Sequence, residues 1–243
     1  MNKSEITNSN KFAIIIGIGR AGCNVLNYIY KNCNYNGIDF FALSTDMQIL
    51  SALEIPLSSK LLIGENITHG NGAADNPEKG RLSAMESAEF IENKLESNHY
   101  KLAFIVTGMG GGTGTGAAPI IANICKSMGI YTIAICSMPF SFEGQRKIRQ
   151  ALEGIDKLEN NVNNIAIVSN EKIINSNSSF TISDVFKTSD ELFYIPIDTI
   201  LSSLMTTGYK NIDYADINDK LSEVIPAQIQ QQMQNLMEGK KNK

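Results

Sequence analysis

Two glycine-rich segments of this sequence have the residue types and spacing that hold phosphate groups. Gly17, Gly19 and Gly22 form a G-x-G-x-x-G pattern directly after a short β-branched run. Residues 107–116 contain six glycines with Thr113 and Thr115, and a helical pattern follows at once. Glycine lets a phosphate approach the backbone N–H groups closely, and a helix N-terminus favours an anion. Two such loops in one chain predict a polyphosphate held from both sides.

The first segment taken alone is the fingerprint of a dinucleotide-binding enzyme, which also has an acidic residue about 20 positions further on. Asp39 and Asp46 lie near that distance, so an NAD(P) oxidoreductase is one interpretation. The second glycine loop argues against it, and neither His69 nor His99 looks catalytic. A flexible glycine linker fits poorly, because apolar strand and helix patterns flank the second loop closely.

Strand-like and helix-like segments alternate along the chain and must position these loops. We expect strands near residues 12–16, 40–43, 102–106, 131–136 and 165–168, and helices over 24–31, 46–53, 78–95, 117–128 and 143–158. The strands are near-continuous apolar runs, as in a parallel sheet covered on both faces. This pattern predicts a doubly wound α/β domain, in which ligands bind at the carboxyl ends of the strands.

The composition narrows the function classes. The chain has 243 residues, 43% of them hydrophobic, and a formal net charge of −4. This negative charge argues against a protein that binds nucleic acid mainly by electrostatic attraction. No apolar run approaches the roughly 20 residues that span a bilayer, and the start lacks a secretory segment. Four cysteines without CxxC spacing are expected to be reduced core or loop residues rather than a zinc site. A cytoplasmic protein is expected.

The second glycine loop also carries a family resemblance. Residues 108–119 resemble the signature of the tubulin/FtsZ family in its bacterial form. Further matches follow in the family's order at residues 17–24, 44–46, 72–80, 139–144, 168–172, 186–190 and 211–216. Apolar positions at helical spacing predict a long helix over residues 183–207 and a short C-terminal helix over residues 227–238. The resemblance implies that a tubulin/FtsZ-type GTPase domain, a doubly wound parallel sheet, precedes these helices. It also implies GTP or GDP as ligand, with Mg²⁺.

The resemblance implies binding roles for residues in each matched segment. Near the phosphates it implies Arg20, Ala21, Gly22, Cys23, Asn24, Asp46, Ala73, Ala74, Gly110, Gly111, Gly112, Thr113 and Gly114. Near the sugar and the base it implies Glu143, Lys147, Asn170, Phe186 and Asp190. Mg²⁺ would bind with the phosphates without a direct side-chain ligand, and Asp46 would lie nearby.

Three positions depart from the family's pattern. The first glycine segment usually has more glycine, so Arg20 can either reach a phosphate as an extra cation or point to solvent. Ala74 stands where the family commonly has glycine, which puts the backbone geometry there in question. Lys147 replaces the usual arginine, which keeps the charge but loses the fork geometry.

Base recognition is expected from one helix face. Phe186 can stack on a purine, and Asp190 can accept from guanine N1–H and N2–H, with Asn170 supplying an amide. Phe186 and Asp190 are four positions apart and therefore share a face. Without the resemblance, Phe186 would be interpreted as a core residue and Asp190 as a surface residue.

The segment 211–216 matches the family loop that completes the GTPase site of the next subunit in a filament. The resemblance therefore implies that Asn211, Asp213 and Asp216 are catalytic in trans, and that GTP hydrolysis is coupled to filament or dimer assembly. Two exposed loop acids are the plainer interpretation. A non-hydrolysing GTP-binding regulator that binds or caps filaments of a full-length FtsZ is the alternative function.

Similarity fades after Ile217, where the family would continue with a second domain. We divide the chain into a disordered lead-in (1–11), a GTP-binding domain (12–182), a long helix with the catalytic loop (183–217), and a short helix with a basic tail (218–243). The long helix contains Pro196, which should kink or break it. In the tail, Ile229, Met233, Leu236 and Met237 share one helical face. Residues 227–243 are expected to pack on the protein itself, to dock a partner or another copy, or to bind a membrane weakly.

Overall fold

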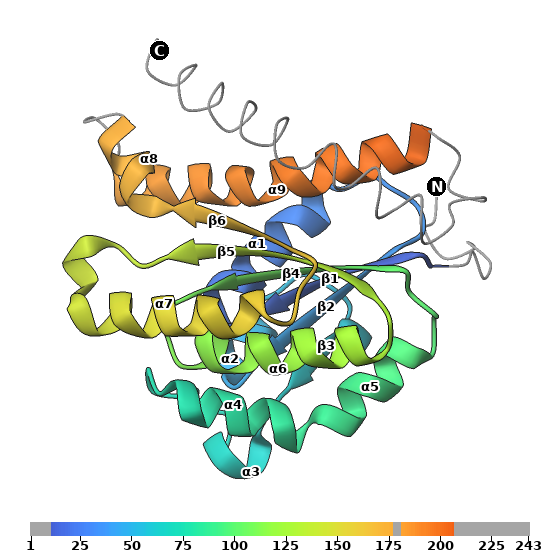
Figure 1. Cartoon of the computed structure of the whole chain (residues 1–243), viewed down its shortest axis with the longest axis horizontal. Coiled ribbons are helices and arrows are strands. Elements are labelled where there is room, and N and C mark those ends of the chain that lie inside the picture. Colours follow the sequence, from blue (N-terminus) through green and yellow to red (C-terminus); the bar gives the residue numbers. More distant parts are fainter. Residues whose placement is uncertain (1–10, 177–180, 207–243) are drawn as a thin grey trace.

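The computed structural model describes residues 11–176 and 181–206, whose strands form one parallel sheet (Figure 1). The strands are β1 (Ala13–Ile18), β2 (Ile38–Ser44), β3 (Lys60–Leu62), β4 (Leu102–Gly108), β5 (Tyr131–Met138) and β6 (Asn164–Ser169). Their order is β3-β2-β1-β4-β5-β6, and every neighbouring pair is parallel. The predicted doubly wound α/β fold is confirmed.

Helices cover both faces of the sheet. They are α1 (Gly19–Asn32), α2 (Met47–Ser51), α3 (Glu65–Thr68), α4 (Pro77–Glu86), α5 (Ala88–Glu96), α6 (Thr113–Ser127), α7 (Gln145–Glu159), α8 (Asn170–Ser176) and α9 (Ile182–Thr206). In Figure 1, α1 and α9 lie above the sheet, and α4 to α7 lie below it. Two short 3₁₀ turns, Leu57–Ser59 and Ser141–Glu143, complete the described elements.

The apolar strands are explained by this double cover. Ala13 and Ile15 of β1 belong to the core cluster that contains α1 and α9. Ile14 and Ile16 belong to the cluster on the other face, with α5, α6 and α7. Successive side chains of a strand point to opposite faces, so a strand buried on both sides is apolar throughout.

The chain reverses its direction across the sheet between β1 and β4. From β1 it proceeds outward through β2 and β3, and it then returns to place β4 on the other side of β1. Ile18 is paired in register with Thr107, and the Thr107 hydroxyl donates to the Ile18 carbonyl at 3.2 Å. Both glycine segments therefore begin side by side, at the switch point where ligands of such sheets bind.

Two helices begin earlier than predicted. Helix α1 starts at Gly19 rather than residue 24, and α6 starts at Thr113 rather than residue 117. Glycine has a low helix propensity, which shifted both expected starts. Close packing overrides that propensity here, because several of these glycines lie directly against the backbone of other elements.

The predicted helix over residues 78–95 is two helices. Ser87 separates α4 from α5 with φ −99° and ψ 8°, and its hydroxyl accepts the N–H of Gly64 at 3.2 Å. Serine competes for hydrogen bonds outside the helical ladder, which favours such an interruption.

Pro196 does not break α9, which continues from Ile182 to Thr206 as one helix. Buried residues on both sides of the proline, among them Phe193 and Ile197, pack against the core. Tertiary packing therefore holds the helix together where one hydrogen bond is missing.

Three short elements were not predicted, and three predicted segments fall outside the described residues. The sequence patterns did not predict β3, α3 or α8, which are all short. Residues 1–10 of the lead-in, the predicted catalytic loop 211–216 and the tail 218–243 lie outside the described residues. Cys23, Cys125 and Cys136 are buried free thiols, as expected of core cysteines. Within residues 11–176 and 181–206, no helix combines the length and apolar character needed to cross a bilayer.

Candidate functional site

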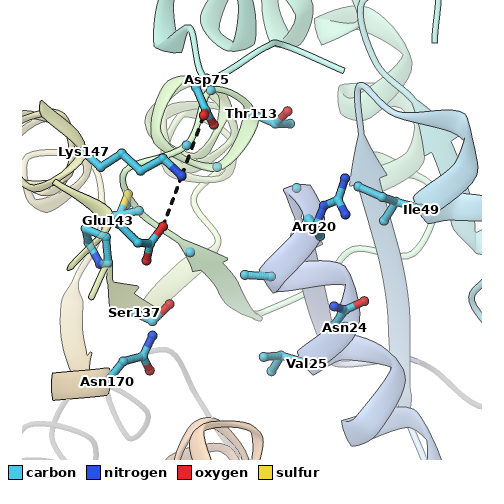
Figure 2. Close-up of a pocket in the computed structure, with 18 of the residues that line it drawn as sticks. Arg20, Asn24, Val25, Ile49, Asp75, Thr113, Ser137, Glu143, Lys147 and Asn170 are labelled. Atoms are coloured by element: carbon cyan, nitrogen blue, oxygen red, sulfur yellow. Dashed lines mark hydrogen bonds and ion pairs between the residues drawn. The ribbon is translucent and has the colours of Figure 1, made fainter. Parts of the chain in front are cut away.

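A cavity of about 900 Å³ lies at the carboxyl ends of the central strands (Figure 2). Its lining comes from the start of α1, helix α2 with its N-cap, the loop 71–75, the second glycine loop, the segment 137–147 and helices α8 and α9. These are the segments that the sequence motifs singled out. The fold therefore gathers them around one space.

Only one face of helix α1 lines this cavity, so only some residues of the first glycine segment reach it. Arg20, Ala21 and Asn24 line it, whereas Gly22 and Cys23 do not. A Cβ on Gly22 would lie 2.2 Å from the Val106 carbonyl oxygen, and the Cys23 thiol contacts the Leu43 carbonyl in the core. The prediction treated residues 20–24 as a loop, but in a helix positions 22 and 23 face the sheet.

Most glycines of the second loop are required by packing rather than by a ligand. Added Cβ atoms on Gly108, Gly112 and Gly114 would meet protein atoms at 2.3–2.8 Å. Gly111 differs, because a Cβ there would meet, among the described residues other than its chain neighbours, only Asp75 Oδ1 within 4 Å, at 3.8 Å. Among the described residues of this loop, Gly111 is therefore the position with open space for a ligand.

Gly110 and Thr115 stabilise the loop instead of lining the cavity. Gly110 has φ +97°, and its N–H donates to the Thr115 hydroxyl at 2.9 Å. Thr115 is buried, so its hydroxyl is not the ligand donor that the sequence suggested. Thr113 does line the cavity, and its Oγ1 lies 2.6 Å from that of Thr45.

The loop 71–75 contains a left-handed turn built without glycine. Ala74 has φ +48° and Asp75 has φ +53°. The left-handed conformation is thus kept although alanine stands at position 74, and a non-glycine residue there costs roughly 1–2 kcal/mol. Ala73 and Ala74 both line the cavity, as the resemblance implied for a phosphate-proximal loop.

Arg20 and Asp46 form an ion pair at the rim of the cavity, with Nη2 and Oδ2 3.6 Å apart. The other Asp46 oxygen accepts the Gln48 N–H at 2.9 Å and caps α2. The Arg20 side chain is 76% exposed, so the pair is a weak, screened contact. The guanidinium therefore remains within reach of either a phosphate or solvent.

Lys147 lies between two carboxylates across the cavity (Figure 2). Its Nζ donates to Glu143 Oε2 at 3.1 Å and lies 3.7 Å from Asp75 Oδ2. The hydrogen bond to Glu143, with the charge of Asp75, raises the pKa of Lys147. Glu143 Oε1 accepts the Phe140 N–H at 2.9 Å, which fixes this carboxylate.

Helix α9 supplies the other end of the cavity. Phe186 and Asp190 both line it, which confirms that they share a helix face. Burial, with the charge of Glu191, raises the pKa of Asp190 to about 6. Asn170 is held by its amide, which donates to the Met138 carbonyl at 3.2 Å and accepts from the Ser189 hydroxyl at 3.1 Å.

An aromatic cluster at this end was missed by sequence reasoning. Phe140 stacks on Phe142 with ring centroids 4.9 Å apart, and it meets Phe186 edge to face at 5.8 Å. Phe142 and Phe186 remain largely exposed although both line the cavity. Phe142 lies inside the matched segment 139–144, so its aromatic type was an available signal. Asp75 also lines the cavity. The resemblance implied that its loop, residues 72–76, lies near the phosphates, but it gave this residue no role of its own.

The chemistry of the lining fits a magnesium nucleotide. The first turn of α6 presents backbone N–H groups beside the open side of Gly111, which suits a phosphate. No group of three His, Cys, Asp or Glu side chains is placed to hold a metal ion in the described part of the chain. Asp46 lines the cavity and is the carboxylate for which the resemblance implied a position near Mg²⁺. The predicted catalytic residues Asn211, Asp213 and Asp216 lie outside the described residues.

Comparison with known proteins agrees with this geometry. The model of the tubulin/FtsZ family, GTPase domain, matches residues 13–178. The cell division protein FtsZ of Aquifex aeolicus is 40% identical over 210 residues, which are 86% of this chain and 56% of that protein. The chain therefore spans about half the length of the curated relatives it matches.

Solved structures give the same result. An empty FtsZ dimer from M. jannaschii has a TM-score of 0.77 at 31% identity, over 88% of this chain and 61% of that one. CetZ1 from Haloferax volcanii, a GDP-bound monomer, has a TM-score of 0.74 at 22% identity, over 87% and 64% of the two chains. The second likeness supports the fold alone.

Proposed function

Because this chain belongs to the tubulin/FtsZ family, we propose that its cavity binds GTP and GDP and that the protein is an FtsZ-like GTPase of cell division. The observation that carries this proposal is the length and polarity of one continuous cavity. It extends from the open glycine Gly111 at the start of α6 to Phe186 and Asp190 on α9. A phosphate-binding end and a base-binding end are thereby joined in one space.

The phosphates bind at the N-terminus of α6. Backbone N–H groups of residues 111–114 point toward them, and the helix dipole favours their negative charge. Thr113 adds a hydroxyl that Thr45 holds in place. Mg²⁺ bound with the phosphates neutralises part of their charge, and Asp46 is the carboxylate suited to orient its water shell.

The base binds against α9. Phe186 offers an exposed ring for stacking, and the ionised Asp190 accepts two hydrogen bonds from guanine N1–H and N2–H. Adenine does not present that pair of donors, so Asp190 favours guanine. Glu143 lies between the two ends, where its oxygens can accept the ribose hydroxyls.

Hydrolysis is completed by a second copy of the chain. Asp213 and Asp216 position the attacking water on the neighbour's nucleotide, and Asn211 supports them. Phosphoryl transfer depends mainly on positioning and electrostatics, so carboxylates delivered in trans couple hydrolysis to assembly. The 31% identical M. jannaschii protein is a dimer in its structure, which supports an assembly of this kind.

Phosphate release measured against protein concentration tests the proposal. Specific activity should rise with concentration, and Asp213→Ala should abolish turnover while leaving GDP affinity unchanged. Electron microscopy with GTP should show filaments or dimers. GTP binding without turnover at any concentration would instead favour a regulator that caps the filaments of a full-length FtsZ.

A further inference from the structure

The Asp75 carboxylate lies between the open glycine of the phosphate loop and Lys147. Its Oδ1 is 3.8 Å from the position that a Cβ on Gly111 would take. Its Oδ2 is 3.7 Å from Lys147 Nζ. A negative charge therefore faces the place where the proposed function puts a phosphate.

The backbone holds Asp75 in this position. The Asp75 carbonyl accepts from Gln150 Nε2 at 3.1 Å, so α7 holds the main chain as well as the side chain. The next residue, Asn76, caps α4 by accepting the Glu78 N–H at 2.9 Å. The left-handed turn at Ala74 and Asp75 is thus fixed on both sides.

Figure 2 places Asp75 and Asn170 at opposite ends of the view, with Lys147 beside Asp75 and Glu143 between the two ends. Asn170 and α9 form the base end of the proposed site. The terminal phosphate of a nucleotide is the part farthest from its base. The last phosphate of a triphosphate is therefore the group that comes nearest to Asp75.

The described lining of the cavity has fewer positive than negative side chains, so no cation is available to neutralise Asp75 alone. It contains two cations, Arg20 and Lys147, and four carboxyl groups, at Asp46, Asp75, Glu143 and Asp190. Arg20 is paired with Asp46, and Lys147 is shared by Asp75 and Glu143. Adding a phosphate next to Asp75 makes Lys147 serve three anionic groups.

We propose that Asp75 sets the preference of the site between GTP and GDP by repelling the terminal phosphate, and that Lys147 moderates this repulsion. The inference rests on the proposed function, since it needs a guanine nucleotide in the cavity. GDP leaves the contact between Asp75 and Lys147 undisturbed. GTP makes the flexible Lys147 side chain divide its charge between Asp75 and the added phosphate.

Asp75→Asn tests the role of the charge. Asparagine keeps the size of the side chain and tolerates φ > 0, so the turn is preserved. We expect GTP affinity to rise relative to GDP affinity by about threefold to fivefold, the range of a partly exposed charge pair. Asp156→Asn is the matched control, because it removes an equal charge from an exposed position on α7 outside the cavity.

Lys147→Gln gives the second arm of the test. This variant should weaken GTP binding more than GDP binding, and adding Asp75→Asn should remove part of the loss. Such a cycle measures the coupling of the two residues separately from their individual effects. Calorimetric titrations with GTP and with GDP, each with Mg²⁺ and with EDTA, provide the affinities.

Each outcome decides between the claims. A GTP-to-GDP ratio that rises in Asp75→Asn and not in Asp156→Asn supports the inference. An unchanged ratio overturns it, and so does weaker GTP binding confined to the titrations with Mg²⁺, which would place Asp75 in the metal's water shell. If the wild-type protein binds neither nucleotide, the proposed function itself fails. If it binds both and the ratio does not respond, only the inference fails.

Discussion

The hydroxyl oxygens of Thr45 and Thr113 lie 2.6 Å apart and join the end of β2 to the first turn of α6. Thr45 is fully buried, and its carbonyl accepts the Gly72 N–H at 2.9 Å. Thr45 therefore connects the first turn of α6 with the loop 71–75, and both segments line the cavity.

Thr45→Val should lower both stability and nucleotide affinity. Valine has a similar shape but leaves Thr113 without this partner, so we expect a loss of about 1–2 kcal/mol in the free energy of unfolding. Chemical denaturation and GDP titration measure the two effects. Thr132→Val is the control, since it removes another buried hydroxyl that bonds to the Ile130 carbonyl, far from the cavity lining. Equal GDP affinity in the two variants would contradict the role of Thr45.

Gly111→Ala and Gly114→Ala should behave differently. An added methyl on Gly111 meets no described protein atom closer than 3.8 Å, so the variant should fold normally but bind GTP at least about tenfold more weakly. On Gly114 the methyl would lie 2.3 Å from the Gly108 carbonyl oxygen, which should cost about 1–3 kcal/mol of stability. Thermal unfolding and titration distinguish the two. Wild-type affinity in Gly111→Ala would place the phosphates elsewhere.

Ala74→Gly should stabilise the protein. The left-handed φ of +48° penalises alanine but not glycine, while glycine gains entropy in the unfolded chain. We expect a net gain of about 0.5–1 kcal/mol in the free energy of unfolding. Ala73→Gly, at a neighbouring buried position without a positive φ, should instead destabilise. A loss of stability in Ala74→Gly would show that the turn is not strained.

The affinity for GDP should depend on the ionisation of Asp190. Its pKa of about 6 means that guanine loses its acceptor as the pH falls through 6, so affinity at pH 5 should be about tenfold lower. Phosphate groups also titrate near pH 6, so the ratio of wild-type to Asp190→Asn affinity isolates the Asp190 contribution. A ratio that stays constant from pH 5 to pH 8 would rule out a contribution of ionised Asp190 to GDP affinity.

Asp190→Asn should also change the stability of the protein, and at pH 7 it should raise it. The folded-state pKa of Asp190 is raised, so its ionised form opposes folding, and this cost appears as the pH rises from about 4 through about 6. Asp190→Asn should therefore be more stable than the wild type at pH 7, by roughly 1 kcal/mol after allowance for partial exposure. Denaturation at pH 7 and pH 4 measures the difference, which should disappear at the lower pH.

Phe186→Ala should weaken GDP binding by about 1–3 kcal/mol, the usual contribution of a base stacked on an aromatic ring. The ring is 52% exposed, so its removal should change stability little. Phe90→Ala removes a ring that is 65% exposed and outside the cavity, and it should alter neither property much. Equal GDP affinities in the two variants would exclude stacking on Phe186.

Much of the fold followed from local sequence patterns. Continuous apolar runs such as that of β1 indicated a parallel sheet covered on both faces, and this was confirmed. The predicted starts of α1 and α6 were wrong, because both helices begin several residues earlier, at Gly19 and Thr113. The low helix propensity of glycine disfavours a helix in these segments, but tertiary packing outweighs it. The interruption at Ser87 was not predicted, and its hydroxyl accepts an N–H from Gly64, which lies in another loop. Pro196 was expected to kink or break α9, but it does not break the helix, because buried side chains on both sides of it pack against the core.

The sequence by itself determined that two glycine segments each follow a strand and lead into a helix, which is enough to predict a phosphate site. Only the tertiary structure decided that Gly111 is open to a ligand while Gly114 is filled by backbone. It alone brought Asp75 to Lys147, 72 positions along the chain, through the packing of α7 beside the loop 71–75. Periodicity and spacing specify the face of an element, whereas contacts between distant segments depend on how the elements pack together.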